Sequence, residues 1–310
     1  MPTDIAATGH LFVVGRPRTG STLLQHVLNR SPHVCLAPET HFFRRARHLG
    51  LADRLRDARD DGAIRALVAD LYTPDAYSGK GLWNWLRRNV PEAAFAERLA
   101  ATDRTLRGLF ALGLQVYAEH RCESAQPLLL GEKTPEHLAN VPELRAWFPD
   151  ARVIHTFRDP RAIFTSELRR RQAGRWGLKR RLPWLPDAVG DPLLTPIEMG
   201  HTALTWRRAA RLDARYRREL GEQYLLVRFE DLIARPEAEL QRICTFLEIP
   251  FTPSLLEARR TGSSYTVDRH AGEGFDPGAA DRWRRHISPA AARFLGGALR
   301  ADMDRYGYEA

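Results

Sequence analysis

The chain has 310 residues, of which 44% are hydrophobic and 27% charged, so it can bury one large α/β core or two smaller ones. Its net charge of +9 favours an anionic partner such as nucleic acid, acidic lipid or a phosphorylated ligand. The three cysteines include no C-x-x-C pair, so we expect neither a disulfide framework nor a cysteine-based zinc site. No apolar run reaches the ~18 residues of a membrane span, and the first ten residues lack a signal-peptide layout. We therefore expect a soluble, cytoplasmic protein.

Five short segments predict strands, at residues 11–14, 34–36, 128–130, 152–157 and 224–229. The first is fully apolar and predicts a buried strand. Helical patterns follow, beginning at Ser21, Pro160, about Thr195 and about Pro236, and again after a predicted loop at 261–277. Residues 51–120 are predicted to be mostly helical, with a tryptophan-containing break at 72–85, and residues 172–196 to be an irregular insertion. Strands that alternate with helices predict an α/β fold, with a parallel sheet flanked by helices in a single domain over residues 1–310.

A glycine loop joins the first strand to the first helix, and it reads G-R-P-R-T-G-S-T from Gly15 to Thr22. In this position backbone N–H groups and the positive end of the helix point at one spot, which suits an anion. The spacing is that of a P-loop, but Ser21 occupies the lysine position and the cation is Arg18, inside the loop. The loop therefore predicts an anion site without the lysine clamp of a nucleotide triphosphatase.

The segment P-R-T-G-S-T resembles the 5′-phosphosulfate loop of sulfotransferases that use 3′-phosphoadenosine 5′-phosphosulfate (PAPS). With L-L-x-x-x-L-x-x-x-P and E-T after it, the segment is closest to the tyrosylprotein and related bacterial sulfotransferases. The resemblance implies a P-loop-type sheet, PAPS as sulfuryl donor and 3′-phosphoadenosine 5′-phosphate (PAP) as product. It also implies that the donor is bound by Arg18, Thr19, Gly20, Ser21 and Thr22.

A second anion site is predicted where the strand at 152–157 ends. The strand delivers Arg158 to its carboxyl end, Asp159-Pro160 starts a helix, and Ser166 lies about two turns along it. A guanidinium and a hydroxyl that converge can hold a phosphate. In the resembled family this arginine and serine bind the 3′-phosphate of the donor.

Glu39, in A-P-E-T after the strand at 34–36, is a candidate general base for the proton of an acceptor hydroxyl. The resembled subfamily has its base glutamate at this place, and His41 and His137 are rival bases. Lys133 is one of only three lysines among 47 Lys and Arg residues. It follows the strand at 128–130 and would offset charge on the bridging oxygen of the donor, together with Arg18. No metal ion is expected.

The segment after the loop at 261–277 is expected to close over the nucleotide, with Arg282 and Trp283 as contacts. Arg269 is a further candidate for the 3′-phosphate, and Ser263 and Ser264 are candidates for a catalytic hydroxyl. The resemblance implies that residues 51–120 and 172–196 shape the acceptor pocket, for a small molecule, carbohydrate, lipid or peptide tyrosine.

Two other classes of protein remain as alternatives. A P-loop kinase or NTPase would need a loop lysine and an aspartate at the end of a strand, and this chain has Ser21 and Arg158 there. A nucleic-acid-binding protein would use the arginine clusters at 169–171 and 175–181, but no aromatic ladder is interleaved with them.

Overall fold

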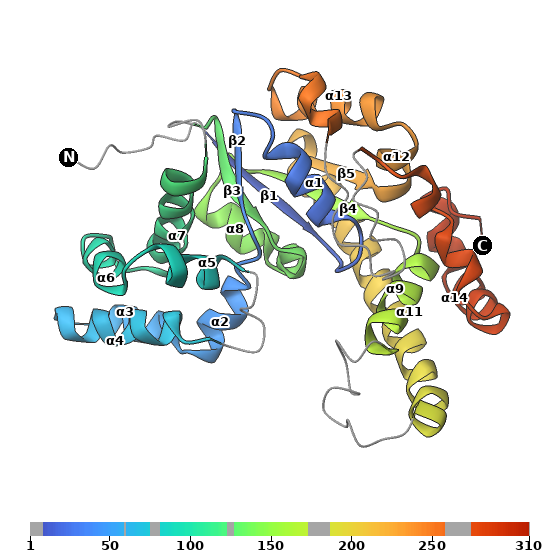
Figure 1. Cartoon of the computed structure of the whole chain (residues 1–310), viewed down its shortest axis with the longest axis horizontal. Coiled ribbons are helices and arrows are strands. Elements are labelled where there is room, and N and C mark those ends of the chain that lie inside the picture. Colours follow the sequence, from blue (N-terminus) through green and yellow to red (C-terminus); the bar gives the residue numbers. More distant parts are fainter. Residues whose placement is uncertain are drawn as a thin grey trace. The chain divides into compact units, whose positions relative to one another are not determined.

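The computed structural model describes residues 9–58, 60–74, 81–122, 127–172, 187–257 and 274–309, with residues 187–193 as backbone only. Its five strands are β1 (Gly9–Gly15), β2 (Val34–Ala37), β3 (Leu129–Lys133), β4 (Arg152–Phe157) and β5 (Tyr224–Arg228). They form one sheet in the order β2-β3-β1-β4-β5 (Figure 1). β3 pairs in parallel with both β1 and β2. The predicted α/β fold with a parallel sheet is therefore confirmed.

The chain divides into two compact units. The first comprises Met1–Val14 and Leu28–Val153, and the second Gly15–Val27 and Ile154–Ala310. The helices of the first unit are α2 (Phe42–His48), α3 (Leu51–Asp57), α4 (Asp61–Tyr72), α5 (Leu82–Asn89), α6 (Glu92–Ala100), α7 (Leu106–Arg121), the 3-10 helix η1 (Pro135–Asn140) and α8 (Val141–Trp147).

The second unit carries α1 (Ser21–Leu28), whose last residue belongs to the first unit, and most of the later helices. Its α-helices are α9 (Pro160–Gln172), α11 (Asp187–Leu220), α12 (Phe229–Ala234), α13 (Pro236–Leu247) and α14 (Pro289–Arg305). Its 3-10 helices are η2 (Gly221–Gln223), η3 (Pro253–Glu257), η4 (Pro277–Ala279) and η5 (Arg282–Arg285).

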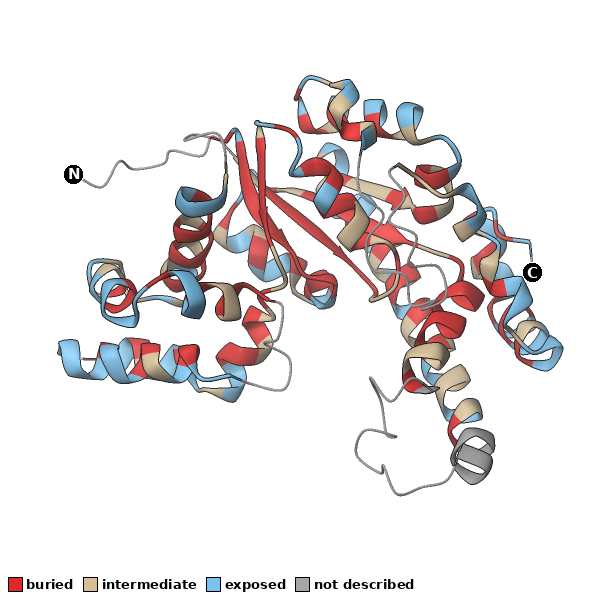
Figure 2. Ribbon diagram, viewed as in Figure 1, coloured by how far each residue is buried: buried red, intermediate tan, exposed pale blue. Residues whose placement is uncertain are grey.

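Strands β1 to β4 are buried along almost their whole length, and Figure 2 shows them mainly in the buried colour. Most of their residues are apolar, as expected for strands covered on both faces. In the first unit, aromatic rings pack on one another beside the strands, with Phe110 in contact with Phe12, Phe42 and Trp147. Close strand pairing explains Gly131, since a Cβ there would lie 1.7 Å from the carbonyl oxygen of Leu11.

Two sequence-based boundaries differ from the structure. The predicted break at 72–85 is too long, because α5 begins at Leu82 and contains both Trp83 and Trp85. Residues 187–196, predicted to be irregular, belong to α11, and residues 173–186 lie outside the described part. Pro and Gly near the start of α11 suggested a loop, but the helix includes both, since propensity is a weak guide beside tertiary packing.

The cysteines also differ from the expectation of no disulfide. Cys35 of the buried strand β2 is joined to Cys122, directly after α7, across a sequence separation of 87. Cys244 is free and buried. The pair was not predicted because its two partners are distant in the chain. Disulfides are uncommon in reducing compartments, so the cysteines do not support the expected cytoplasmic location.

Candidate active site

The glycine loop, in the second unit, turns sharply between β1 and α1. Gly20 has φ +85°, and a Cβ there would lie 2.4 Å from Cδ2 of Phe229, so both conformation and space require glycine. Arg18 has φ +76°, a left-handed conformation that is uncommon for a residue with a side chain and often marks a functional site. The loop backbone is therefore strained at Arg18, the arginine in the middle of the loop.

Internal hydrogen bonds fix the loop. The Thr19 hydroxyl donates to the carbonyl of Arg16 at 2.7 Å and lies 2.7 Å from the hydroxyl of Thr156. Arg16 itself donates to Glu167 at 2.9 Å and to Thr205 at 2.8 Å, and it is buried. The Thr19 hydroxyl and the Arg16 guanidinium are thus committed to holding the loop. Ser21 is buried and Thr22 half-buried at the start of α1.

The two predicted anion motifs meet in the second unit. Nε of Arg18 donates to Oγ of Ser166 at 2.7 Å, and Nη1 of Arg158 donates to the backbone carbonyl of Arg18 at 3.2 Å. The Asp159 carboxylate accepts from the N–H of Arg161 at 2.7 Å, which confirms the predicted start of α9. Residues separated by 140 or more positions in the sequence thus form one cationic cluster, here called the Arg18–Arg158–Ser166 cluster.

Two contacts of Arg158 were not singled out from the sequence. Its guanidinium lies over the ring of Phe229, 4.1 Å from the centroid, and Nη2 donates to the carbonyl of Ala279 at 3.0 Å. Phe229 directly follows β5, within the segment V-R-F-E-D-L. Because ligands bind beyond the carboxyl ends of the strands in such sheets, the end of β5 was the sequence signal that could have pointed to Phe229. Ala279 contacts Arg158 only through its backbone carbonyl oxygen, a group that every residue has, so the sequence could not identify this contact.

The predicted late segment contacts Arg158 through Ala279, and the two residues named from the sequence there have other partners. Arg282 is paired with Asp276, and Trp283 is buried with the Arg161 guanidinium 4.5 Å from its ring centroid. Ser263, Ser264 and Arg269 lie outside the described residues.

A second cluster of charged side chains lies in the first unit, around Glu39. Oε1 of Glu39 accepts from Nζ of Lys133 at 2.5 Å, and Oε2 lies 3.2 Å from Nε2 of His41. The other ring nitrogen of His41, Nδ1, lies 3.1 Å from Oε2 of Glu136. Both oxygens of Glu39 are thus held by nitrogen donors, although its side chain remains 36% exposed. Lys133 is 4% exposed and ends β3 rather than following it.

These contacts shift two pKa values in opposite directions. Burial alone would raise the pKa of Glu39, but hydrogen bonds and charges from His41 and Lys133 lower it to about 2. Burial alone would lower the pKa of His41, but its hydrogen bonds to Glu136 and Glu39 raise it to about 9. At neutral pH the carboxylate is therefore ionised and the imidazole protonated.

The backbone around Glu39 is fixed by the start of α5. The carbonyl of Glu39 accepts from the N–H of Leu82 at 3.0 Å, and a Cβ at Gly81 would lie 2.3 Å from that oxygen. The carbonyl of Thr40 accepts from the indole of Trp83 at 2.8 Å. The helix α5, whose start was predicted too late in the sequence, therefore positions the backbone of Glu39, the candidate base.

His137, the other rival base, is buried beside a second carboxylate. Its Nδ1 contacts Glu132, which also accepts from the hydroxyl of Thr134 at 2.7 Å. Both His137 and Glu132 are at most 2% exposed. This arrangement fits a structural ion pair better than a group that exchanges protons with a ligand.

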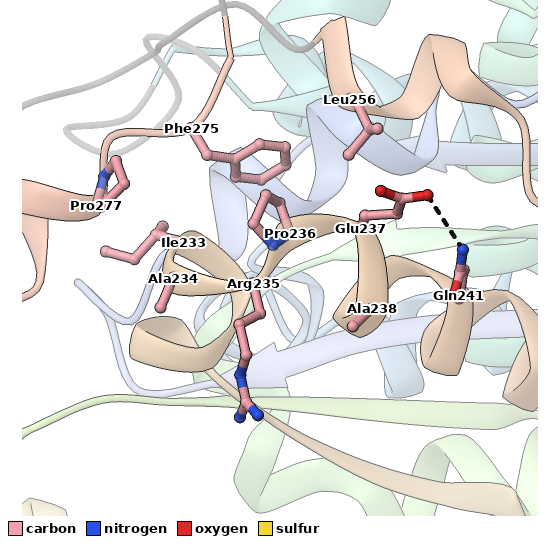
Figure 3. A pocket seen from close by; sticks show the side chains of 10 residues that line it. All are labelled: Ile233, Ala234, Arg235, Pro236, Glu237, Ala238, Gln241, Leu256, Phe275 and Pro277. Carbon is pink, nitrogen blue, oxygen red and sulfur yellow. Dashed lines mark hydrogen bonds between the residues drawn. The ribbon is translucent and has the colours of Figure 1, made fainter.

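A cavity of about 670 Å³ lies at the start of α13 in the second unit (Figure 3). Apolar and polar side chains line it together, among them Ile233, Pro236, Leu256, Phe275 and Arg235. Among the described residues that line it, none is a predicted site residue. Within the described part of the chain, no group of three or more His, Cys, Asp or Glu side chains is arranged to hold a metal ion. The described helices include none with the length and apolar character that a membrane crossing requires.

Residues 10–253 match the sequence profile of the sulfotransferase family, so the chain belongs to that family. Carbohydrate sulfotransferase 3 of Mus musculus is 28% identical over an alignment of 171 positions that covers 52% of this chain and 34% of that protein. Carbohydrate sulfotransferase 6 of Homo sapiens is 26% identical over 82% of this chain and 67% of its own length. The chain spans about a third to a half of the length of the first curated relatives it matches.

The fold is also that of a solved sulfotransferase domain, from the Synechococcus PCC 7002 olefin synthase. Its TM-score is 0.58 at 23% identity, over 100% of this chain and 98% of that one.

Proposed function

We propose that this protein is a PAPS-dependent sulfotransferase that moves a sulfuryl group to an acceptor hydroxyl. The observation that carries the proposal is the Arg18–Arg158–Ser166 cluster, in which a strained glycine loop and a second cationic motif meet in a chain of the sulfotransferase family. The sequence motifs and the geometry of the described residues both support PAPS as the donor.

The chemistry of this cluster fits a nucleotide with phosphate groups at two positions. The loop from Arg18 to Thr22 would hold the 5′ end, with the N-terminus of α1 and the Arg18 guanidinium offsetting its charge. Arg158 and Ser166 would hold the 3′-phosphate, and the donor would supply the activated sulfuryl group. Serine at position 21 leaves the loop without the lysine that a triphosphate clamp requires.

Glu39 and Lys133 would act in the transfer step. Glu39 would accept the proton of the acceptor hydroxyl, and Lys133 and Arg18 would offset charge on the leaving oxygen. A carboxylate with a pKa of about 2 is a weak base. Loss of the Lys133 contact would remove one of the interactions that lower this pKa and would make Glu39 a stronger base.

Nucleotide preference tests the donor. PAP is expected to raise the melting temperature more than ATP with Mg²⁺ does. Arg158→Ala should weaken PAP binding by about ten-fold or more in calorimetry, because it removes charge-assisted hydrogen bonds. Arg215→Ala, at an exposed arginine paired with Glu219, is the matched control. Preference for ATP with Mg²⁺, or unchanged affinity in Arg158→Ala, would contradict the assignment.

The base is tested separately. Glu39→Gln should lower turnover by about 10²–10⁴-fold while PAP affinity is retained. Turnover is measured as PAP formation from PAPS with a phenol, an N-acetylhexosamine and a tyrosine peptide as acceptors. Glu97→Gln, at an exposed position of α6, serves as the control. Retained turnover in Glu39→Gln would assign the proton transfer to another group.

A further inference from the structure

The corner between β5 and α12 contacts the backbone next to Arg158. Oε1 of Glu230, the residue after Phe229, accepts from the N–H of Asp159 at 3.0 Å. Its other oxygen, Oε2, accepts from the hydroxyl of Tyr308 at 3.0 Å. A half-buried carboxylate thus holds the peptide group that directly follows Arg158.

The other side of Arg158 is held as well. The indole of Trp206 on α11 donates to the carbonyl of Arg158 at 2.9 Å, and the ring of Phe229 lies against its guanidinium. Side chains from α11 and α12 therefore fix the Arg158 backbone, and one of them carries a charge. An arginine that is preorganised in this way loses little side-chain entropy when it binds a phosphate.

We propose that Glu230 is a positioning residue for Arg158, and that phosphate binding at Arg158 is coupled to proton binding at Glu230. The inference rests on the proposed function, because it takes Arg158 to be the phosphate ligand. It adds a residue that does not touch the nucleotide but sets the conformation and charge of the residue that does.

The groups around Glu230 give the sign of the coupling. Burial raises the pKa of Glu230 above its usual value, the charge of Arg158 lowers it and that of Asp159 raises it. Arg228 on β5 also interacts with Glu230, and its guanidinium lies 4.5 Å from the ring centroid of Tyr308. The neighbouring acid of α12, Asp231, is paired with Arg228 and Arg235.

A phosphate that binds Arg158 neutralises the cation that lowers the pKa of Glu230 and brings a second negative charge close to it. Both effects raise this pKa in the complex, so binding takes up a proton. The Glu230 contribution to affinity is therefore greatest at low pH, and it is lost as the pH rises through the raised pKa of the complex.

Calorimetry with PAP in buffers of different ionisation enthalpy, between about pH 5.5 and 8, measures affinity and proton uptake together. Glu230→Gln keeps an oxygen that can accept from the N–H of Asp159 but cannot titrate. It should therefore take up fewer protons than the wild type when PAP binds, and its PAP affinity should depend less on pH. Subtracting the proton uptake of the variant from that of the wild type cancels the protons that PAP itself takes up or releases. Glu237→Gln, at an exposed glutamate of α13, should match the wild type in both measurements.

Tyr308→Phe provides a milder variant in case Glu230→Gln does not fold. It keeps the carboxylate and removes one hydrogen bond, so PAP affinity should fall about three-fold while proton uptake persists. If PAP does not bind the wild type, the proposed function fails. If PAP binds, and Arg158→Ala weakens it, but Glu230→Gln and Tyr308→Phe match the wild type in affinity and proton uptake, only the positioning role is overturned.

Discussion

At the scale of single residues, the contacts of Glu39 keep its carboxylate ionised and also make it a weak base. Lys133 and His41 each take one of its oxygens, and Glu136 holds the far side of the imidazole. The four side chains form a chain of alternating charge in which the lysine is the most buried. Loss of either cationic contact would raise the pKa of Glu39 and make it a stronger base.

The pH dependence of kcat/KM distinguishes Glu39 from His41 as the base. With Glu39 as base, kcat/KM should be level between about pH 5 and 8, because Glu39 stays ionised and His41 protonated in that range. Neutral His41 as base would instead make kcat/KM rise about ten-fold per pH unit up to about pH 9. In that case Glu136→Gln should move the rise to lower pH, since it removes a hydrogen bond that raises the pKa of His41.

At the scale of elements, the loop before α1 depends on Phe229 of α12 as much as on its own sequence. Gly20 combines a positive φ with the close approach of the Phe229 ring, and that ring also lies under Arg158. One aromatic side chain therefore contacts both the glycine loop and the second anion motif.

Gly20→Ala should disrupt this arrangement, because the new methyl group would overlap the ring in a conformation that alanine rarely adopts. We expect PAP affinity to fall by about ten-fold or more, with a lower melting temperature. Gly200→Ala is the matched control, since a Cβ at that position of α11 meets nothing within 4 Å and alanine favours a helix. If Gly20→Ala bound PAP as the wild type does, the loop would not need this conformation.

The elements whose boundaries could be predicted are those with strong local signals. β4 matches the prediction over residues 152–157, because a segment with Val, Ile, Thr and Phe is followed closely by the helix start at Asp159-Pro160. The start of α5 could not be predicted, since Gly81 is required by the carbonyl of Glu39 and not by a turn. In the sequence, that glycine looked like part of a loop.

The candidate site was predictable in its residues but not in its contacts. Arg18, Arg158 and Ser166 were marked by motifs, and the structure joins them. Phe229 and Ala279 contact Arg158 through a ring face and a backbone oxygen, for which sequence motifs carry little information. Lys133 and His41 were named from the sequence, but their pairing with Glu39 was not predicted.

At the scale of the whole molecule, the disulfide constrains much of the first unit. It links β2 to the end of α7, and α2 to α6 lie in the chain between them. A cross-link over so long a segment removes many conformations from the unfolded chain, which is the usual account of how disulfides stabilise proteins.

Reduction should therefore lower the free energy of unfolding by about 2–5 kcal/mol. Denaturation with and without a reducing agent measures the difference. Cys122→Ser should no longer respond to the reducing agent, whereas Cys244→Ser should respond as the wild type does. Three reactive thiols in the denatured, unreduced protein, instead of one, would show that the bond is absent.

Lysine is so rare in this chain that amine chemistry becomes selective. The ammonium of Lys133 contacts Glu39, and only 4% of the Lys133 side chain is exposed. An acylating reagent can therefore react with this amine only after the ion pair opens. The rate at which an adduct accumulates at this position thus reports how often the candidate base is released from its counter-ion, without any acceptor having been identified.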